Sequence, residues 1–181
     1  MRTSKHLRSP SRNRSRKDEG TALTDKDLPV QYVVFRLGKE EYAFDISVVK
    51  EIHELQEIAK VHKSPAYVEG VMNLRGKLVT VIDLRKRLGL DARAPDDLSK
   101  IVVVDASDAP VGFLVDEVTE VARIGRDLIE PPPSYVSEGM EAEYVLGIAK
   151  FGDRLVTLVD PLKVLELSVE GAEKPGGKKD A

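Results

Sequence analysis

One stretch decides the fold: Val68-Glu-Gly-Val-Met-Asn-Leu-Arg-Gly-Lys-Leu-Val-Thr-Val-Ile-Asp-Leu-Arg-Lys-Arg-Leu-Gly-Leu90. Its pattern predicts a strand over 68–74, a tight turn at 75–77, a second strand over 78–82 and a short helix that begins at Asp83. The stretch occurs again 77 positions later as Val145–Leu167, and nine of the 23 aligned residues are identical without a gap. The chain therefore contains an internal duplication, and the other segments are interpreted as parts of its two copies.

The segment before this stretch is also repeated, at a spacing of 69 residues. The matched positions include Tyr32 with Ile101, Phe44 with Phe113 and Glu51 with Glu120. The chain thus divides into lobe-forming units near 30–92 and 99–167. Each unit is near the lower size limit for a self-sufficient core, so the two lobes are expected to share apolar surface.

Short strands at close spacing, with little helix between them, predict a mainly β fold of two small barrels. The duplicated body spans 30–167. Residues 1–29 are polar and rich in Ser and Arg, and residues 168–181 are rich in Gly and Lys. Such segments bury too little apolar surface to offset their ordering entropy, so both are predicted to be disordered tails.

Composition restricts the classes of function. The chain has no cysteine, which excludes disulfides and thiolate metal sites. No apolar run approaches the roughly 20 residues that span a membrane, and no secretory signal is recognisable, so we expect a cytoplasmic protein. The net charge of −3 hides an asymmetry, because residues 1–17 hold seven Lys or Arg and no acid. Residues 18–181 contain 21 basic and 31 acidic residues. This acidic balance argues against nucleic-acid binding by the folded part.

A search for a catalytic set finds none, and no cofactor, metal or small-molecule substrate is predicted. His53 and His62 lack metal-ligand spacing, and no nucleophile motif is present. Asp83 and Asp160 stand at matched places in the repeat. They could form a carboxylate pair, but each precedes a short helix pattern, so a helix cap explains them better.

The segment Asn73-Leu74-Arg75-Gly76 departs from the repeat, because the second copy has Lys150-Phe-Gly-Asp153 there. Asn and Gly are ordinary hairpin residues, and a surface Arg needs no special explanation. However, the first copy carries a multi-donor cation at this turn, and an Arg is suited to holding a carboxylate through two parallel bonds. Both a structural turn and a binding turn are therefore possible.

Several segments together resemble the CheW family of chemotaxis coupling proteins. They are Phe35–Ile46, Val49–Ile52, Gly70–Gly76, Val81–Arg85, Gly112–Val118 and Leu146-Gly147. The resemblance covers about 30–167 and implies two five-stranded barrels of the Src-homology-3 type packed over a shared apolar core. It also implies a non-enzymatic adaptor that binds the regulatory domain of a CheA-type histidine kinase and the cytoplasmic tips of chemoreceptors.

The resemblance also implies which positions take part in kinase or receptor binding. They are Val49, Glu51, Gly70, Asn73, Leu74, Arg75, Gly76, Gly112, Val118 and Val121. The three valines could form an apolar docking surface, or they could equally be core residues. We also expect Arg75 and Glu51 to form an ion pair that fixes the Asn73–Gly76 turn.

The expected function is thus coupling of receptors to a kinase within membrane-associated arrays, by a protein that is a monomer when free. Two alternatives remain. One is a CheW-like adaptor of another pathway, such as pili or surface sensing. The other is nucleic-acid binding through the basic arm 1–17, which would weaken steeply with salt and vanish when the arm is deleted.

Overall fold

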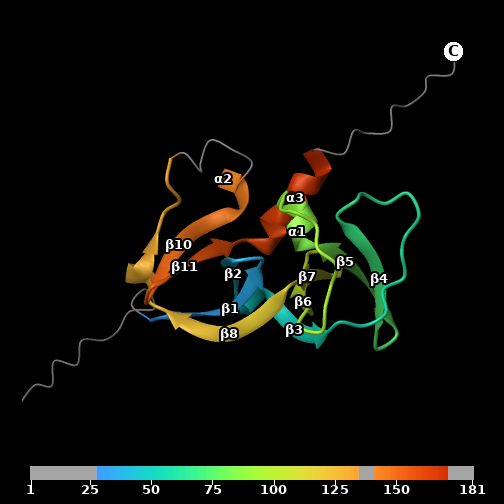
Figure 1. Ribbon diagram of the computed structural model, residues 1–181, viewed down its shortest axis with the longest axis horizontal. Helices are drawn as coiled ribbons and strands as arrows, with labels where there is room; N and C mark the ends of the chain where they lie inside the picture. Colours follow the sequence, from blue (N-terminus) through green and yellow to red (C-terminus); the bar gives the residue numbers. More distant parts are fainter. Residues whose placement is uncertain (1–27, 135–140, 171–181) are drawn as a thin grey trace, which may run out of the picture.

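A computed structural model describes residues 28–134 and 141–170, and two β-sheets dominate it (Figure 1). The strands are β1 Val30–Leu37, β2 Glu40–Asp45, β3 Val49–Glu54, β4 Val68–Leu74, β5 Lys77–Asp83, β6 Lys100–Asp105, β7 Pro110–Val115, β8 Glu117–Ile124, β9 Ile129–Glu130, β10 Val145–Phe151 and β11 Arg154–Val159. The helices are α1 Leu84–Arg87, α2 Glu141–Tyr144 and α3 Pro161–Glu170, with single 3₁₀ turns η1 Ile46–Val48 and η2 Arg126–Leu128. The predicted strand–turn–strand–helix order of the repeated stretch is therefore present in both copies.

Each sheet takes strands from both repeat units. The six-stranded sheet has the order β8-β1-β2-β11-β10-β9, and the five-stranded sheet has the order β3-β6-β7-β5-β4. The first hairpin of each unit therefore lies in the sheet built mainly by the other unit, joined there by the parallel pairs β2–β11 and β7–β5. The units 30–92 and 99–167 do not each build one sheet. The exchange ties the sheets together, since neither can separate without unpairing strands.

The mainly β class is confirmed, but the sheets are not closed barrels. One of them also has six strands rather than five, because the short β9 pairs with β10. In the five-stranded sheet the outer strands are β3 and β4. The chain beyond β3 returns to β4 through a single bridge between Ala59 and Val71. That bridge pairs the β3–β4 connection with the edge strand β4, without a continuous ladder.

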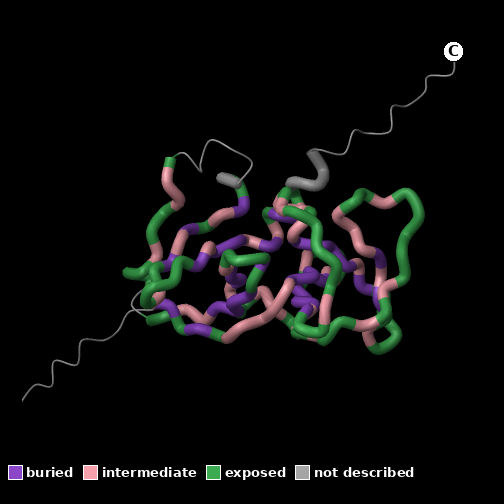
Figure 2. Tube along the Cα trace, viewed as in Figure 1, coloured by how far each residue is buried: buried purple, intermediate pink, exposed green. Residues whose placement is uncertain are grey.

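The expected shared core lies between the two sheets. The rings of Phe35 on β1 and Phe44 on β2 pack together with a centroid distance of 4.8 Å. Phe44 also packs against Phe113 of β7, with a centroid distance of 5.4 Å. All three rings are fully buried, and the cluster also takes in Leu84 of α1 and Val164 of α3. Figure 2 shows buried segments running along the strands and exposed segments in the connecting loops. Alternation along β1 places Tyr32 and Val34 in a separate cluster on its opposite face, because successive side chains point to opposite sides.

Both aspartates of the repeat act as helix caps, as the sequence predicted. Asp83 Oδ1 accepts a hydrogen bond from the amide of Lys86 at 3.3 Å, and Asp160 Oδ1 accepts from Leu162 at 3.0 Å. Helix α3 continues to Glu170, so residues 168–170 are helical rather than part of a tail. The tails at 1–27 and 171–181 lie outside the described residues, and their predicted disorder stays a prediction.

Candidate functional site

The Asn73–Gly76 segment forms a two-residue hairpin turn between β4 and β5. Arg75 and Gly76 both have positive φ, 52° and 83°, as a type I′ turn requires. Asn73 Oδ1 accepts a hydrogen bond from the Gly76 amide at 2.8 Å, and the Asn73 carbonyl accepts one from Gln56 Nε2 at 3.0 Å. The turn is therefore fixed from within and from the neighbouring loop, and it presents Arg75 outward with 74% of its side chain exposed.

The expected pair of Arg75 with Glu51 is confirmed. Arg75 Nη1 donates to Glu51 Oε1 at 2.7 Å, and the other carboxylate oxygen of Glu51 is hydrogen-bonded to His53 Nε2. The hydrogen bonds from His53 and from Arg75 lower the pKa of the Glu51 carboxyl below its ordinary value. Glu51 lies on β3 and Arg75 follows β4, so this cluster fastens the two edges of the five-stranded sheet.

The second repeat unit contains a matching clamp that the sequence comparison missed. Arg154 at the start of β11 donates to Glu41 Oε2 at 2.9 Å, and it also pairs with Glu120. Glu120 is the repeat partner of Glu51, while Arg154 lies two positions beyond the residue aligned with Arg75. The second turn itself, Gly152-Asp153, carries no Arg, but Arg154 follows it at the start of β11 and still reaches the matched Glu.

The structure divides the other predicted site residues between surface and interior. Gly70 and Gly112 are buried. A Cβ added at Gly70 would lie 2.1 Å from the Ala59 carbonyl oxygen, and one added at Gly112 would lie 2.7 Å from Ile101 Cγ2. Neither glycine is available to touch a partner as the structure stands, so close packing explains both. The remaining positions range from half-buried Leu74, Val49 and Val118 to Val121, which is 50% exposed.

The two valines that are half-buried belong to the shared core at its edge. Val49 on β3 and Val118 on β8 both pack against the Phe35–Phe44–Phe113 cluster. Val121 is three residues further along β8, which is an edge strand of the six-stranded sheet. Of the three valines, Val121 alone has a largely exposed side chain. The alternative that these valines are core residues therefore applies mainly to Val49 and Val118.

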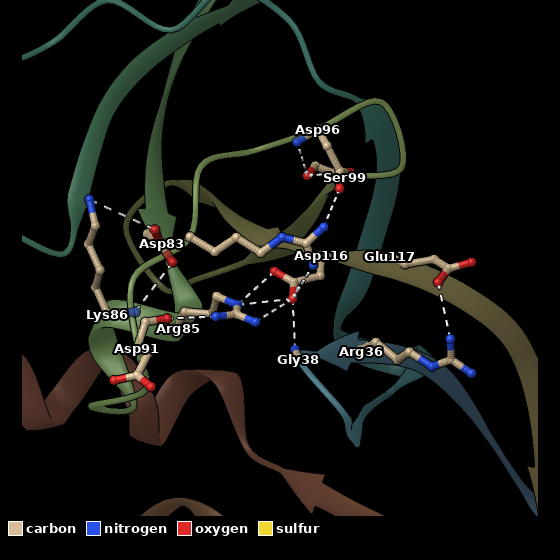
Figure 3. A network of polar contacts seen from close by, with 11 residues as sticks. Arg36, Gly38, Asp83, Arg85, Lys86, Asp91, Asp96, Ser99, Asp116 and Glu117 are labelled. Carbon is tan, nitrogen blue, oxygen red and sulfur yellow. Dashed lines mark hydrogen bonds and ion pairs between the residues drawn. The ribbon is translucent and has the colours of Figure 1, made fainter.

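A partly buried polar network was not predicted from the sequence (Figure 3). Arg85 Nε donates to both carboxylate oxygens of Asp116 at 2.8 and 2.9 Å, and only 11% and 16% of the two side chains are exposed. The Gly38 amide donates to Asp116 Oδ2 at 2.7 Å. Asp116 lies between β7 and β8, where the chain passes from one sheet to the other. The network therefore joins the helix α1 region, the β1–β2 turn and this crossing point.

The described ranges 28–134 and 141–170 contain no group of three or more His, Cys, Asp or Glu side chains placed to hold a metal ion. Nor do they include a helix with the length and apolar character to cross a membrane. The Asn73–Gly76 turn is taken as the candidate surface, because its backbone is hydrogen-bonded and Arg75 is exposed.

The lowered pKa of Glu51 predicts a pH effect on stability. A carboxyl whose pKa is lower in the folded state favours folding above its unfolded pKa of roughly 4.3, and this contribution is lost as pH falls through the folded pKa. We therefore expect Glu51→Gln to unfold at lower urea concentration than the wild type at pH 7, with the difference shrinking in acid. Urea titrations from pH 7 down to pH 2 measure this. A difference that stays constant over the whole range would show that the charge of Glu51 plays no part.

Comparison with known proteins gives consistent matches over the body of the chain. A family model described as a CheW-like domain matches residues 31–169. The chain is 35% identical over 147 residues to the chemotaxis protein CheW of Helicobacter pylori, covering 81% of this chain and 88% of that protein. It is 33% identical over 143 residues to the chemotaxis protein CheW of Klebsiella aerogenes, covering 79% and 86%. The crystal structure of the scaffolding protein TtCheW from Thermoanaerobacter tengcongensis matches with a TM-score of 0.71 and 36% identity, over 77% of this chain and 94% of that one.

Proposed function

The chain belongs to the CheW-like domain family, and we propose that it is a non-enzymatic chemotaxis adaptor that couples chemoreceptors to a CheA-type histidine kinase. The observation that carries the proposal is the extent of the family match, which runs through both repeat units from residue 31 to residue 169. The relatives are named chemotaxis proteins, and the similar solved structure is a scaffolding protein. An adaptor of this kind would act in the cytoplasm at receptor arrays.

Coupling requires exposed, rigid contact surfaces rather than reactive groups. The Asn73–Gly76 turn fits this need, because its backbone is held by Asn73 and Gln56 while the Arg75 side chain points to solvent. Val121 adds an exposed apolar side chain on β8. We propose that the turn contributes to kinase binding and that β8 contributes to the receptor side. Each contact can be weak, since an array of many copies gains avidity from linkage.

Calorimetric titration with the regulatory domain of the CheA-type kinase from the same organism tests the proposal. We expect saturable binding that Arg75→Ala weakens at least about tenfold, roughly the effect of losing one charge-assisted contact. Arg154→Ala is the matched control, because Arg154 clamps the other sheet through the same type of pair. It should change the affinity by less than about threefold, and circular dichroism should show that both variants fold.

The same titration separates the adaptor from the alternative based on the basic arm. Deletion of residues 1–17 should leave kinase binding unchanged if the folded body makes the contacts. Absence of binding by the wild-type chain would contradict the adaptor proposal. Salt-sensitive binding to single-stranded DNA that disappears with the same deletion would then favour the nucleic-acid alternative.

A further inference from the structure

A small pocket adjoins the Asn73–Gly76 turn at the meeting edges of the five-stranded sheet. Its volume is about 160 Å³, and its walls come from β3, the β4–β5 hairpin and the start of β7. The lining residues are Lys50, Glu51, Leu74, Arg75, Lys77, Val79 and Pro110. Val79 is fully buried and Leu74 half-buried, so the pocket combines an apolar interior with charged walls.

The charged walls leave an excess of positive charge. Arg75 and Glu51 compensate each other through their 2.7 Å contact. Lys50 and Lys77 are exposed, and within the described part of the chain neither has an ion-pair partner. The pocket therefore carries about two uncompensated positive charges, although residues 18–181 hold 21 basic against 31 acidic side chains. The pocket is thus positively charged on a body that is negatively charged overall, and this favours an anionic occupant.

The size of the pocket narrows the class of occupant. Pockets for drug-sized ligands usually have volumes of roughly 300–1,000 Å³, so a site of about 160 Å³ is small for a nucleotide or a metabolite of that size. A single side chain with a short apolar stem and a carboxylate end fits both the volume and the lining. Its methylene groups would meet Leu74 and Val79, while the carboxylate would meet the cations at the rim.

We propose that this pocket receives a Glu or Asp side chain of the partner kinase domain, held by Lys50, Arg75 and Lys77. The inference rests on the proposed function and specifies the chemistry by which the turn recognises its partner. Arg75 uses Nη1 for Glu51, which leaves further guanidinium donors on a largely exposed side chain. Glu51 thus orients Arg75, and the two lysines supply the net attraction.

Charge reversal tests the proposal against the kinase regulatory domain. The double variant Lys50→Glu with Lys77→Glu should weaken binding at least about 100-fold, as expected when two attractive contacts become repulsive. The matched control is Lys60→Glu with Lys63→Glu, which makes the same change in net charge at two exposed lysines outside the pocket. It should change the affinity by less than about threefold at 0.15 M salt. Equal losses in both double variants would overturn the pocket and leave only a general charge effect.

A second measurement does not depend on the kinase. N-acetylglutamate methylamide is titrated into the ¹⁵N-labelled full chain, with N-acetylglutamine methylamide as the neutral probe. We expect saturable shifts of the Arg75 side-chain NH and of the Lys50 and Lys77 amides with the acidic probe only. Equal shifts with the neutral probe, or with inorganic phosphate at the same concentration, would overturn selective carboxylate recognition. If the wild-type chain fails to bind the kinase but these selective shifts appear, the proposed function fails and the carboxylate site stands without that partner.

Discussion

Replacement of Asp116 by alanine is expected to lower the free energy of unfolding by about 3–5 kcal/mol, the range for removing one partner of a buried ion pair. The reason is that Arg85 would keep its charge while losing the carboxylate that accepts its bonds at 2.8 and 2.9 Å. Only 11% of the Arg85 side chain is exposed, so solvent can replace little of that interaction. The Gly38 amide would lose its acceptor as well.

Glu117 provides the control for this prediction, because it is the next residue and also forms an ion pair. Its contact with Arg36 is longer, at 3.5 Å, and the two side chains are 35% and 50% exposed. Glu117→Ala should therefore lower the stability by less than about 1 kcal/mol. Urea unfolding followed by circular dichroism measures both variants. If Asp116→Ala lost no more than Glu117→Ala, the network would have no special role in joining the sheets.

The second large effect is expected for Gly70→Ala, which should lower the free energy of unfolding by at least about 3 kcal/mol. Gly70 has a φ of +146°, which L-residues rarely adopt, and an added Cβ would lie 2.1 Å from the Ala59 carbonyl oxygen. That oxygen accepts a hydrogen bond from the Val71 amide at 2.8 Å, in the bridge that pairs the β3–β4 connection with β4. Relieving the clash would therefore break the bridge or displace β4.

Gly76→Ala is the matched control, since it tests positive φ without the clash. Gly76 has a φ of +83°, and no atom beyond its two chain neighbours lies within 4 Å of the Cβ position. Its replacement should cost about 1 kcal/mol, the conformational penalty alone. Urea unfolding should rank the two variants in this order. A Gly70→Ala protein of wild-type stability that fails to bind the kinase domain would contradict the packing explanation and support direct contact at this position.

These two predictions fall where sequence reasoning was least informative. The resemblance to the CheW family links Gly70 and Gly112 to partner binding. A sequence pattern does not reveal that the Ala59 backbone and the Ile101 side chain approach these glycines. Asp116 likewise shows no local signal, since its partners Arg85 and Gly38 are 31 and 78 residues away. Such contacts depend on where distant segments meet, and neither periodicity nor turn chemistry contains that information.

The sequence by itself determined the duplication, the β class, the hairpins and the helix caps of Asp83 and Asp160. It also led to the pairing of Arg75 with Glu51. Most of these features depend on interactions between residues close in sequence or on strand periodicity, for which residue type is a direct guide. The tertiary structure alone decided that the first hairpins exchange sheets and that Arg154 repeats the clamp from a shifted position. Strand partners and edge contacts depend on which whole faces of the strands become buried. Two equally apolar hairpins therefore cannot be assigned to one sheet or the other from the sequence pattern.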